Sequence, residues 1–172
     1  MSKRVRVVTW ACFNSYDDKV NQPVTVSGEL WGMKTPEVIN FRKQHKTQDS
    51  LRLEQLLGLP PDNGKKKNVE MWVRPADHFR PSADPGITAS EAETFFLTLN
   101  AFIKVSDEFR KWFNNQKTQS YGANGYPWTR LGYIYDWGKN DNNIGMSEFV
   151  ILPCTSVEIN AITSTEEYGN GK

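Results

Sequence analysis

The chain has 172 residues, of which 38% are hydrophobic and 12% aromatic, which suits one globular domain that buries a core without help from metals or disulfides. Lysine and arginine number 21, and aspartate and glutamate 20. This near balance argues against a nucleic-acid-binding protein, which needs a basic excess or patch to neutralise phosphates. The only basic run, Lys65 to Lys67, follows a turn sequence and is predicted to be a solvated turn.

Membrane insertion and export signals are both weak in this sequence. No apolar stretch approaches the roughly 18 residues that a membrane-spanning helix needs. The first apolar run is interrupted by Arg6 and Thr9, so it is predicted to be a strand and not a signal peptide. The chain as it stands is expected in the cytoplasm, or in the periplasm or the medium if a signal peptide has been removed. Cys12 and Cys154 fit either a disulfide between neighbouring strands or two buried free thiols.

Strand and helix patterns interleave along the first half of the chain. Three segments with alternating hydrophobicity are predicted strands: residues 5–12, 23–32 and 68–75. Thr35 as an N-cap and Pro36 in the first turn predict a helix that begins there. A second helix is expected up to Gly58, with an apolar stripe made by Leu53, Leu56 and Leu57. The proline-rich residues 75–86 predict an ordered loop or a single turn of helix.

The second half continues in the same way. The spacing of Thr88 and Glu91 is that of a capping box and predicts a helix from Ala89. A further helix, capped at its start, is predicted over residues 106–117, with Phe109, Trp112 and Phe113 packed together on one buried side. Three more segments are predicted strands: residues 126–137, 147–153 and 155–163. The polar tail, about residues 164–172, is expected to fray.

These elements follow one another without a βαβ rhythm. The sequence therefore predicts an α+β fold with a mainly antiparallel sheet of about six strands and three to four helices. No linker or repeat divides the chain, so residues 1–172 are expected to form a single domain.

The segment from Tyr126 to Trp137 is the most unusual part of the sequence. In a strand, Trp128, Arg130 and Asp136 would share one face, and Gly132 between them would leave room for a recess. A guanidinium beside aromatic planes forms a cationic platform that can bind a ligand. A structural alternative is that Arg130 simply pairs with Asp136 or caps a helix.

The proline-rich loop can contribute further polar groups to such a recess, namely His78 and Arg80. The predicted ligand-binding residues are therefore Tyr126, Trp128, Arg130, Asp136, His78 and Arg80. Aromatic planes with charged and amide side chains nearby suit a glycan, a peptide or a protein partner, because rings stack while polar edges orient the ligand.

Two functions from different classes follow. The first is a non-catalytic binding or interaction domain that uses this recess. The second is a glycan-directed hydrolase that uses Asp136 and Glu148, because glycoside cleavage needs two carboxyl groups in one cleft. Phosphate-loop, nucleophile-elbow, zinc and EF-hand spacings are all missing from the sequence, so no metal and no cofactor is expected.

Three blocks of the sequence, LRLEQLLGLPP, VEMWVRPADHFRPSADP and YPWTRLGYIYDWG, resemble blocks in a set of uncharacterised bacterial proteins, many of them exported. The resemblance covers most of the chain, from about Leu51 to Tyr168. It implies a bacterial origin and a link to the cell envelope. No activity is known for that set, so the resemblance implies no chemistry and no site residue.

Overall fold

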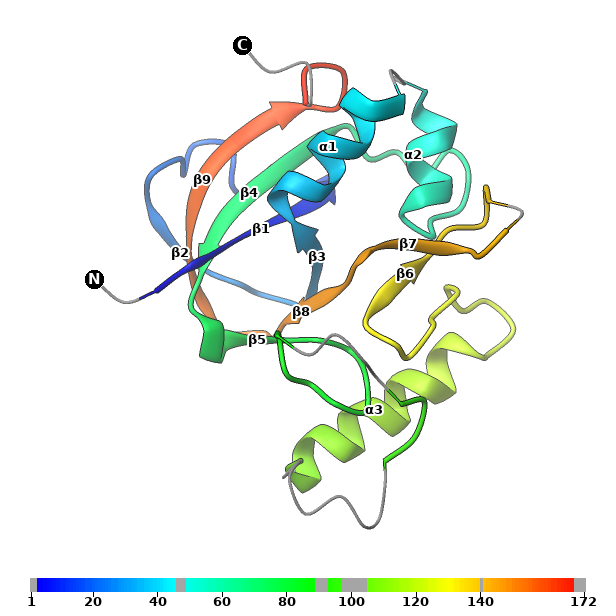
Figure 1. Ribbon diagram of the computed structural model, residues 1–172. Helices are drawn as coiled ribbons and strands as arrows, with labels where there is room; N and C mark the ends of the chain where they lie inside the picture. The colour runs from blue at the N-terminus through cyan, green and yellow to red at the C-terminus, as the bar shows by residue number, and fades with distance from the viewer. Residues whose placement is uncertain (1–2, 46–48, 89–92, 97–104, 140, 169–172) are drawn as a thin grey trace.

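The computed structural model describes residues 3–45, 49–88, 93–96, 105–139 and 141–168 (Figure 1). These residues form one α+β domain with a seven-stranded antiparallel sheet, as the sequence predicts. The strands, in spatial order, are β2 (Pro23–Thr25), β9 (Ser156–Ser164), β4 (Lys67–Val73), β1 (Val5–Ala11), β3 (Leu30–Lys34), β8 (Phe149–Ile151) and β5 (His78–Phe79).

A two-stranded sheet and three helices complete the described part of the chain. The small sheet pairs β6 (Tyr133–Tyr135) with β7 (Ile144–Ser147). The helices are α1 (Thr35–His45), α2 (Ser50–Leu56) and α3 (Asp107–Ser120), and a single 3-10 turn, η1 (Pro75–Asp77), precedes β5. Within the described residues, no helix is both long and apolar enough to cross a membrane.

The large sheet curls around a first hydrophobic core. Antiparallel pairing places Val7 of β1 opposite Met71 of β4, so their side chains share one face. Ile151 of β8 and Ile159 of β9 belong to the same buried cluster, although these strands lie near opposite edges of the sheet. The sheet must therefore bend until both edges meet this core, and Figure 1 shows this curvature.

The opposite face of the sheet carries a second core beneath α1 and α2. Side chains alternate along β1, so Val8 and Trp10 point to this face while Val7 points to the first core. Val38 and Phe41 of α1 and the leucine stripe of α2 cover them. Burial of Leu53, Leu56 and Leu57 confirms the predicted apolar stripe.

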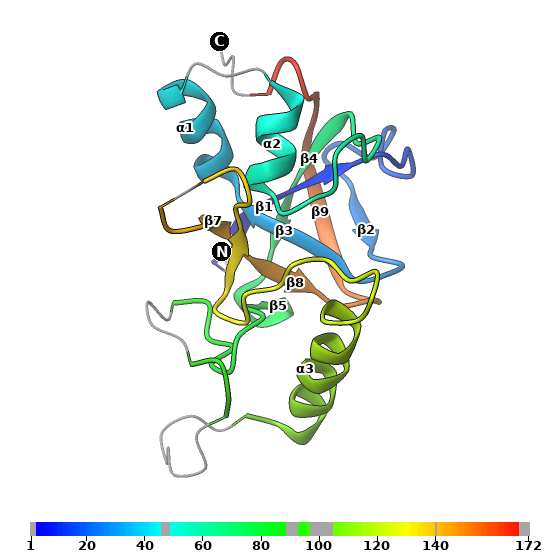
Figure 2. The same ribbon diagram turned by 90° about the vertical axis from the view of Figure 1, so that its right-hand side faces the viewer.

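α3 lies beside the end of the sheet that β5 and β8 form, away from α1 and α2 (Figure 2). Aromatic rings of α3 and β5 pack together there. Ser106 caps this helix by accepting a hydrogen bond from the Phe109 amide, as the sequence predicts. Phe79 of β5 lies 5.1 Å from Phe109 and 4.7 Å from Trp112, measured between ring centroids. Trp112 is half-buried, so its predicted full burial is wrong, and its indole instead reaches the polar surface at Glu29.

The predicted strand over residues 23–32 is two strands. β2 pairs with β9 and β3 pairs with β1 and β8, which are different regions of the sheet. Val26 turns into the first core between them, and its backbone bonds to Cys154 and Thr155. The chain therefore crosses from one side of the curled sheet to the other over residues 26–29.

The predicted strand over residues 126–137 is also interrupted. Arg130 and Gly132 adopt left-handed backbone conformations, with φ of 62° and 72°. Trp128 forms an isolated bridge with Ile134, so the chain reverses between them and only β6 is regular strand. Thr129 favours this turn because its hydroxyl donates to the Tyr133 carbonyl and accepts from the Leu131 amide.

Three further expectations concern the cysteines, the C-terminal tail and the helix from Ala89. Cys12 and Cys154 are free and exposed, neither bridged nor buried. The chain does not fray at residue 164, because Tyr168 is buried and donates a hydrogen bond to Glu70 at 2.9 Å. The start of the helix predicted from Ala89 lies outside the described residues, and residues 93–96, which are described, are not helical.

Leu56 tests the second core. We expect Leu56→Ala to lower the free energy of unfolding by about 2–5 kcal/mol, because a fully buried side chain is replaced by a cavity. Leu51→Ala in the same helix is the matched control, since Leu51 is 43% exposed. Urea unfolding followed by circular dichroism measures both; equal effects of the two substitutions would contradict this placement of the core.

Candidate ligand-binding cleft

A cleft of about 410 Å3 lies where β1 and β3 meet the end of α3 and the chain that follows it. This volume is in the range of binding sites for small ligands. The walls come from the strand ends, the α2–β4 connection, α3 and the segment before β6. Among its lining residues are Trp10, Glu29, Trp31, Lys65, Tyr126, Trp128 and Glu148.

Aromatic side chains from separate elements face this cleft. Trp10 comes from β1 and Trp31 from β3, whereas Tyr126 and Trp128 follow α3. Trp128 is held in place by Phe113, whose ring centroid lies 4.9 Å from its own. Tyr126 is 58% exposed, so its ring stands at the mouth of the cleft and remains available to a ligand.

Glu148 lies in the wall of the cleft, between β7 and β8. Its backbone amide donates to the Gly132 carbonyl at 3.0 Å, which fixes the side chain in the interior. The residue is only 8% exposed, and within the described part of the chain its Oε2 has no hydrogen-bond partner. Burial raises the pKa of Glu148 from its ordinary 4.5 to about 8, so the carboxyl group is protonated at neutral pH.

The Trp128 indole is the second buried polar group of the cleft. Trp128 is 5% exposed, and its Nε1 makes no hydrogen bond of normal geometry to any described residue. The indole is nevertheless a donor to Glu148, and this contact lowers the pKa of that carboxyl group in part, against the larger effect of burial. The indole and the carboxyl group are therefore neighbours, with Trp128 Nε1 and Glu148 Oε2 buried in the wall of the cleft.

Other polar groups around the cleft are bonded within the protein. Lys65 Nζ donates to the Trp10 carbonyl at 3.0 Å. Glu29 accepts a hydrogen bond of 2.8 Å from the Trp112 indole, which joins α3 to the start of β3. These contacts hold the walls in position.

Tyr126 and Trp128, two of the predicted ligand-binding residues, line the cleft, and so does Glu148. Arg130 does not line it. Its guanidinium donates to the Tyr121 hydroxyl at 3.1 Å and to the Thr94 carbonyl at 3.0 Å. Tyr121 in turn donates to the Trp128 carbonyl at 2.7 Å, so Arg130 supports the cleft from behind.

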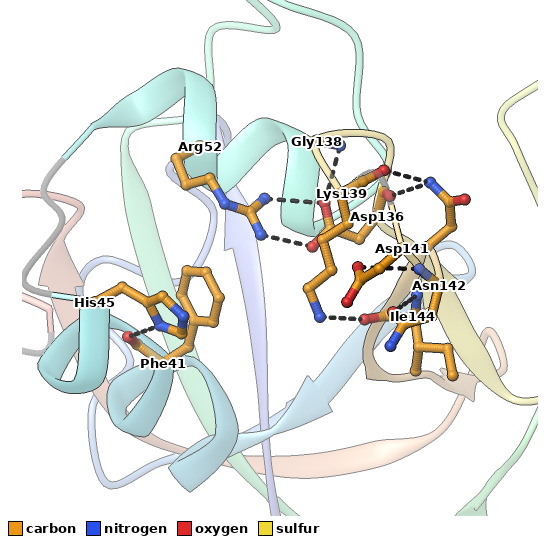
Figure 3. A network of polar contacts seen from close by, with 10 residues as sticks. Phe41, His45, Arg52, Asp136, Gly138, Lys139, Asp141, Asn142 and Ile144 are labelled. Atoms are coloured by element: carbon orange, nitrogen blue, oxygen red, sulfur yellow. Dashed lines mark hydrogen bonds and ion pairs between the residues drawn. The ribbon is translucent and has the colours of Figure 1, made fainter.

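Asp136 is separated from both of its expected partners. Its side chain is fully buried, and both carboxylate oxygens accept hydrogen bonds from Arg52 of α2, at 2.9 and 2.6 Å (Figure 3). The ion pair between Arg130 and Asp136 is thus not formed. Asp136 is also not among the residues that line the cleft, so the structure does not bring Asp136 and Glu148 together there.

His78 and Arg80 stabilise the neighbouring structure and do not line the cleft. His78 is buried edge-on against Phe149, and its Nδ1 bonds to the Arg74 carbonyl. Burial lowers the pKa of His78. Arg80 donates to the carbonyls of Leu131 and Gly132, so it fixes the turn before β6.

Sequence reasoning missed the contribution of β3 to the cleft. Glu29 and Trp31 are two positions apart, and this spacing indicates that they share one face. Nothing local indicates that this face meets Trp128, which lies almost one hundred residues later. The aromatic side chains of residues 106–117 were the available signal, since Trp112 contacts Trp31 at 6.1 Å between ring centroids.

No group of three or more histidine, cysteine, aspartate or glutamate side chains in the described ranges could hold a metal ion. Comparisons with protein-family models, with curated proteins and with solved structures found no match for this chain. The function therefore has to be inferred from the cleft itself.

Asp136→Ala tests the ion pair with Arg52. We expect it to lower the free energy of unfolding by about 3–5 kcal/mol, because it leaves the partly buried Arg52 charge without its counter-ion. Asp141→Ala, an exposed position in the same hairpin, is the control and should have a much smaller effect. A loss below about 1 kcal/mol for Asp136→Ala in urea unfolding would contradict a structural role for this pair.

The raised pKa of Glu148 predicts a pH-dependent stability. The folded chain holds this proton more tightly than the unfolded chain, so the stability is fully present below pH 4.5 and is lost as the pH rises to about 8. Glu148→Gln removes the titration. We expect its stability relative to the unsubstituted protein to rise by on the order of 3–5 kcal/mol between pH 4.5 and pH 9.

Urea unfolding at several pH values checks this, with the exposed Glu108→Gln as the matched control. The control should track the unsubstituted protein from pH 6 to pH 9. A constant offset for Glu148→Gln over that range would show that Glu148 titrates like an exposed carboxyl group.

Proposed function

We propose that this protein is a non-catalytic binding protein and that the aromatic cleft is its ligand site. The observation that carries the proposal is the cleft of about 410 Å3, which aromatic side chains from separate elements line together with the buried carboxyl group of Glu148. A concave, mainly apolar site with a few polar groups is typical of a ligand-binding site.

The walls of the cleft support the same function. Binding sites for organic ligands combine apolar and aromatic walls with a few polar groups that fix orientation. Here Trp10, Trp31 and Tyr126 supply the walls. Contacts with Phe113 and Tyr121 hold Trp128 before any ligand arrives, which reduces the entropy lost on binding.

A hydrolase that uses Asp136 and Glu148 has less support. Glycoside hydrolysis requires two carboxyl groups on either side of the bond that is broken. Glu148 has the raised pKa of a general acid, but Asp136 is bound by Arg52 outside the cleft lining. The binding function needs only the groups that the cleft contains.

Binding can be tested with 15N-labelled protein, because the Trp128 indole N–H gives its own NMR signal. The protein is titrated with neutral oligosaccharides, with charged oligosaccharides and with short peptides. We expect members of one class to shift the Trp128 indole signal. Tyr126→Ala should weaken that binding by about tenfold, because a stacked ring is typically worth 1 kcal/mol or more.

Tyr135→Ala is the matched control, because Tyr135 is also exposed, at 37%, but does not line the cleft. It should bind as the unsubstituted protein does. A Trp128 signal that no probe shifts, or binding that is equally strong in Tyr126→Ala, would overturn the proposal.

A further inference from the structure

We infer that the ligand of this cleft is an extended peptide segment, which adds as a strand to the edge of β3 and places a large apolar side chain in the pocket beside Trp128. The inference rests on the proposed function and specifies the class of ligand. Three features carry it: a gap between two strands of the large sheet, the direction of the backbone groups beside that gap, and the apolar walls around it.

The floor of the cleft is a gap between β1 and β3. The two strands pair only at Val7 and Val8 of β1, and beyond Val8 no residue pair joins them, although the structure describes both strands throughout. β1 nevertheless remains paired with β4 up to Ala11, and β3 is paired with β8 from its first residue, Leu30. Along the cleft, each strand therefore keeps one neighbour and lacks the other.

Backbone groups of β3 point into this gap. Neighbouring residues of a strand turn their N–H and C=O groups to opposite sides. The Ala11 carbonyl accepts from the Lys66 amide on the β4 side, so Val8, three residues earlier, turns its own groups to the β3 side. Met33 is the partner of Val8 and therefore faces β1. By the same alternation Trp31, which lines the cleft, turns its amide and carbonyl to the gap, where β1 no longer pairs with β3.

The edge of β3 is the accessible side of the gap. Trp31 is half-buried and Glu29, just before the strand, is exposed. A Cβ atom on Gly28 would meet nothing within 4 Å, so the approach to the start of β3 is open. On the other side, Trp10 of β1 is only 3% exposed, and its carbonyl already accepts from Lys65. A ligand therefore pairs with β3 and leaves Lys65 on the edge of β1.

An unpaired strand edge matches the backbone of a peptide. Amide and carbonyl groups repeat along an extended peptide at the spacing of those in β3, so the two can join by strand addition. The cleft volume of about 410 Å3 suits a few residues of one extended segment. Its walls include Leu57 at the end of α2 and Ser120 at the end of α3. These walls leave no room for the sheet of a second folded domain.

The lining of the cleft selects the side chains of the peptide. Its apolar members beside β3 include Leu59, Pro127, Trp128 and Ile134. Successive side chains of a strand point to opposite faces, so every second side chain of the peptide meets this lining. A large aliphatic or aromatic side chain gains most there, because it buries the most apolar surface.

The charges of the cleft favour a segment without net charge. Glu29 and Lys65 in the lining have opposite charges. Glu148 is uncharged at neutral pH, because burial raises its pKa to about 8. A charged side chain of the peptide would lose its hydration here without meeting a matching net charge.

A phage-displayed library of random heptapeptides, selected on the immobilised protein at pH 7, tests the inference. We expect the enriched sequences to share uncharged central residues with at least one large apolar side chain, and the synthetic peptides to bind in isothermal titration calorimetry. Tyr126→Ala should weaken this binding about tenfold, because a ring at the mouth of the cleft is lost. Tyr135→Ala, outside the lining, should leave it unchanged.

Methylation of the peptide backbone distinguishes strand addition from binding through side chains alone. Each N-methyl group removes one amide donor, and in a strand only every second amide faces β3. Methylation should therefore lower the affinity at least tenfold at alternate positions and by less than about threefold at the positions between them. A loss that does not alternate would overturn the inference.

Hydrogen exchange of the protein, followed by NMR, gives an independent measure. The Trp31 amide faces the gap, whereas the Gly32 amide faces β8 by the same alternation. Saturating peptide should slow exchange of the Trp31 amide at least tenfold relative to that of Gly32. Equal slowing of the two amides would overturn the inference.

The outcomes separate the inference from the proposed function. If an oligosaccharide shifts the Trp128 indole signal in a way that depends on Tyr126, and no heptapeptide is enriched, the binding function holds and the peptide inference fails. A heptapeptide that binds at the cleft without the alternating effect of methylation leads to the same conclusion. If no probe binds, or if binding does not depend on Tyr126, both proposals fail.

Discussion

The buried ion pair between Arg52 and Asp136 is the contact on which the position of the cleft depends. It joins α2 to the turn after β6, and the Arg52 guanidinium also lies over the Phe41 ring of α1, 4.9 Å from its centroid. Asp136 organises the turn as well, because its Oδ1 accepts from the Gly138 amide and its carbonyl accepts from Asn143. Asp136 and its ion pair with Arg52 therefore fix α1, α2 and the β6–β7 hairpin relative to one another. The same hairpin leads into β8 and so determines where Glu148 enters the interior.

Close backbone contact makes this arrangement possible. A Cβ atom on Gly145 would come within 2.7 Å of the Leu56 carbonyl and 2.6 Å of the Ile134 carbonyl. The missing side chain lets β7 lie between α2 and β6. Ile134, which lines the cleft, is therefore fixed by the backbone of its neighbours as well as by its own packing.

The parts of the fold that the sequence predicts well are those with local causes. The leucine stripe of α2 and the Ser106 cap of α3 act within one or two helical turns, so their patterns are visible in the sequence. The two cores on opposite faces of the large sheet follow from the alternation of side chains along β1. By contrast, the left-handed conformation of Arg130 has no local signal, since this residue type rarely adopts it. It reverses the chain and invalidates any assignment of faces across residues 126–137.

The cleft was only partly predictable for a related reason. Tyr126, Trp128 and Glu148 were recognisable as unusual residues near one another in sequence. Their partner Trp31 is brought to them by the crossing of the chain between β2 and β3 and by α3, which are tertiary events. Asp136 shows the opposite error. It was predicted to belong to the ligand recess, but Arg52, which lies far away in sequence, pairs with it in the interior.

The ends of the large sheet have a consequence for how the protein behaves at high concentration. Its two outer strands, β2 and β5, have three and two residues, and prolines lie at Pro23 and at Pro81, two residues beyond β5. Long unpaired strands act as templates on which further chains add and grow into fibrils, and proline removes the backbone donor that such growth needs. β4 is paired along its length with β1 and β9, whereas β2 covers the outer edge of β9 only over residues 156–158. The short outer strands and their prolines therefore limit the edge that a second chain could extend.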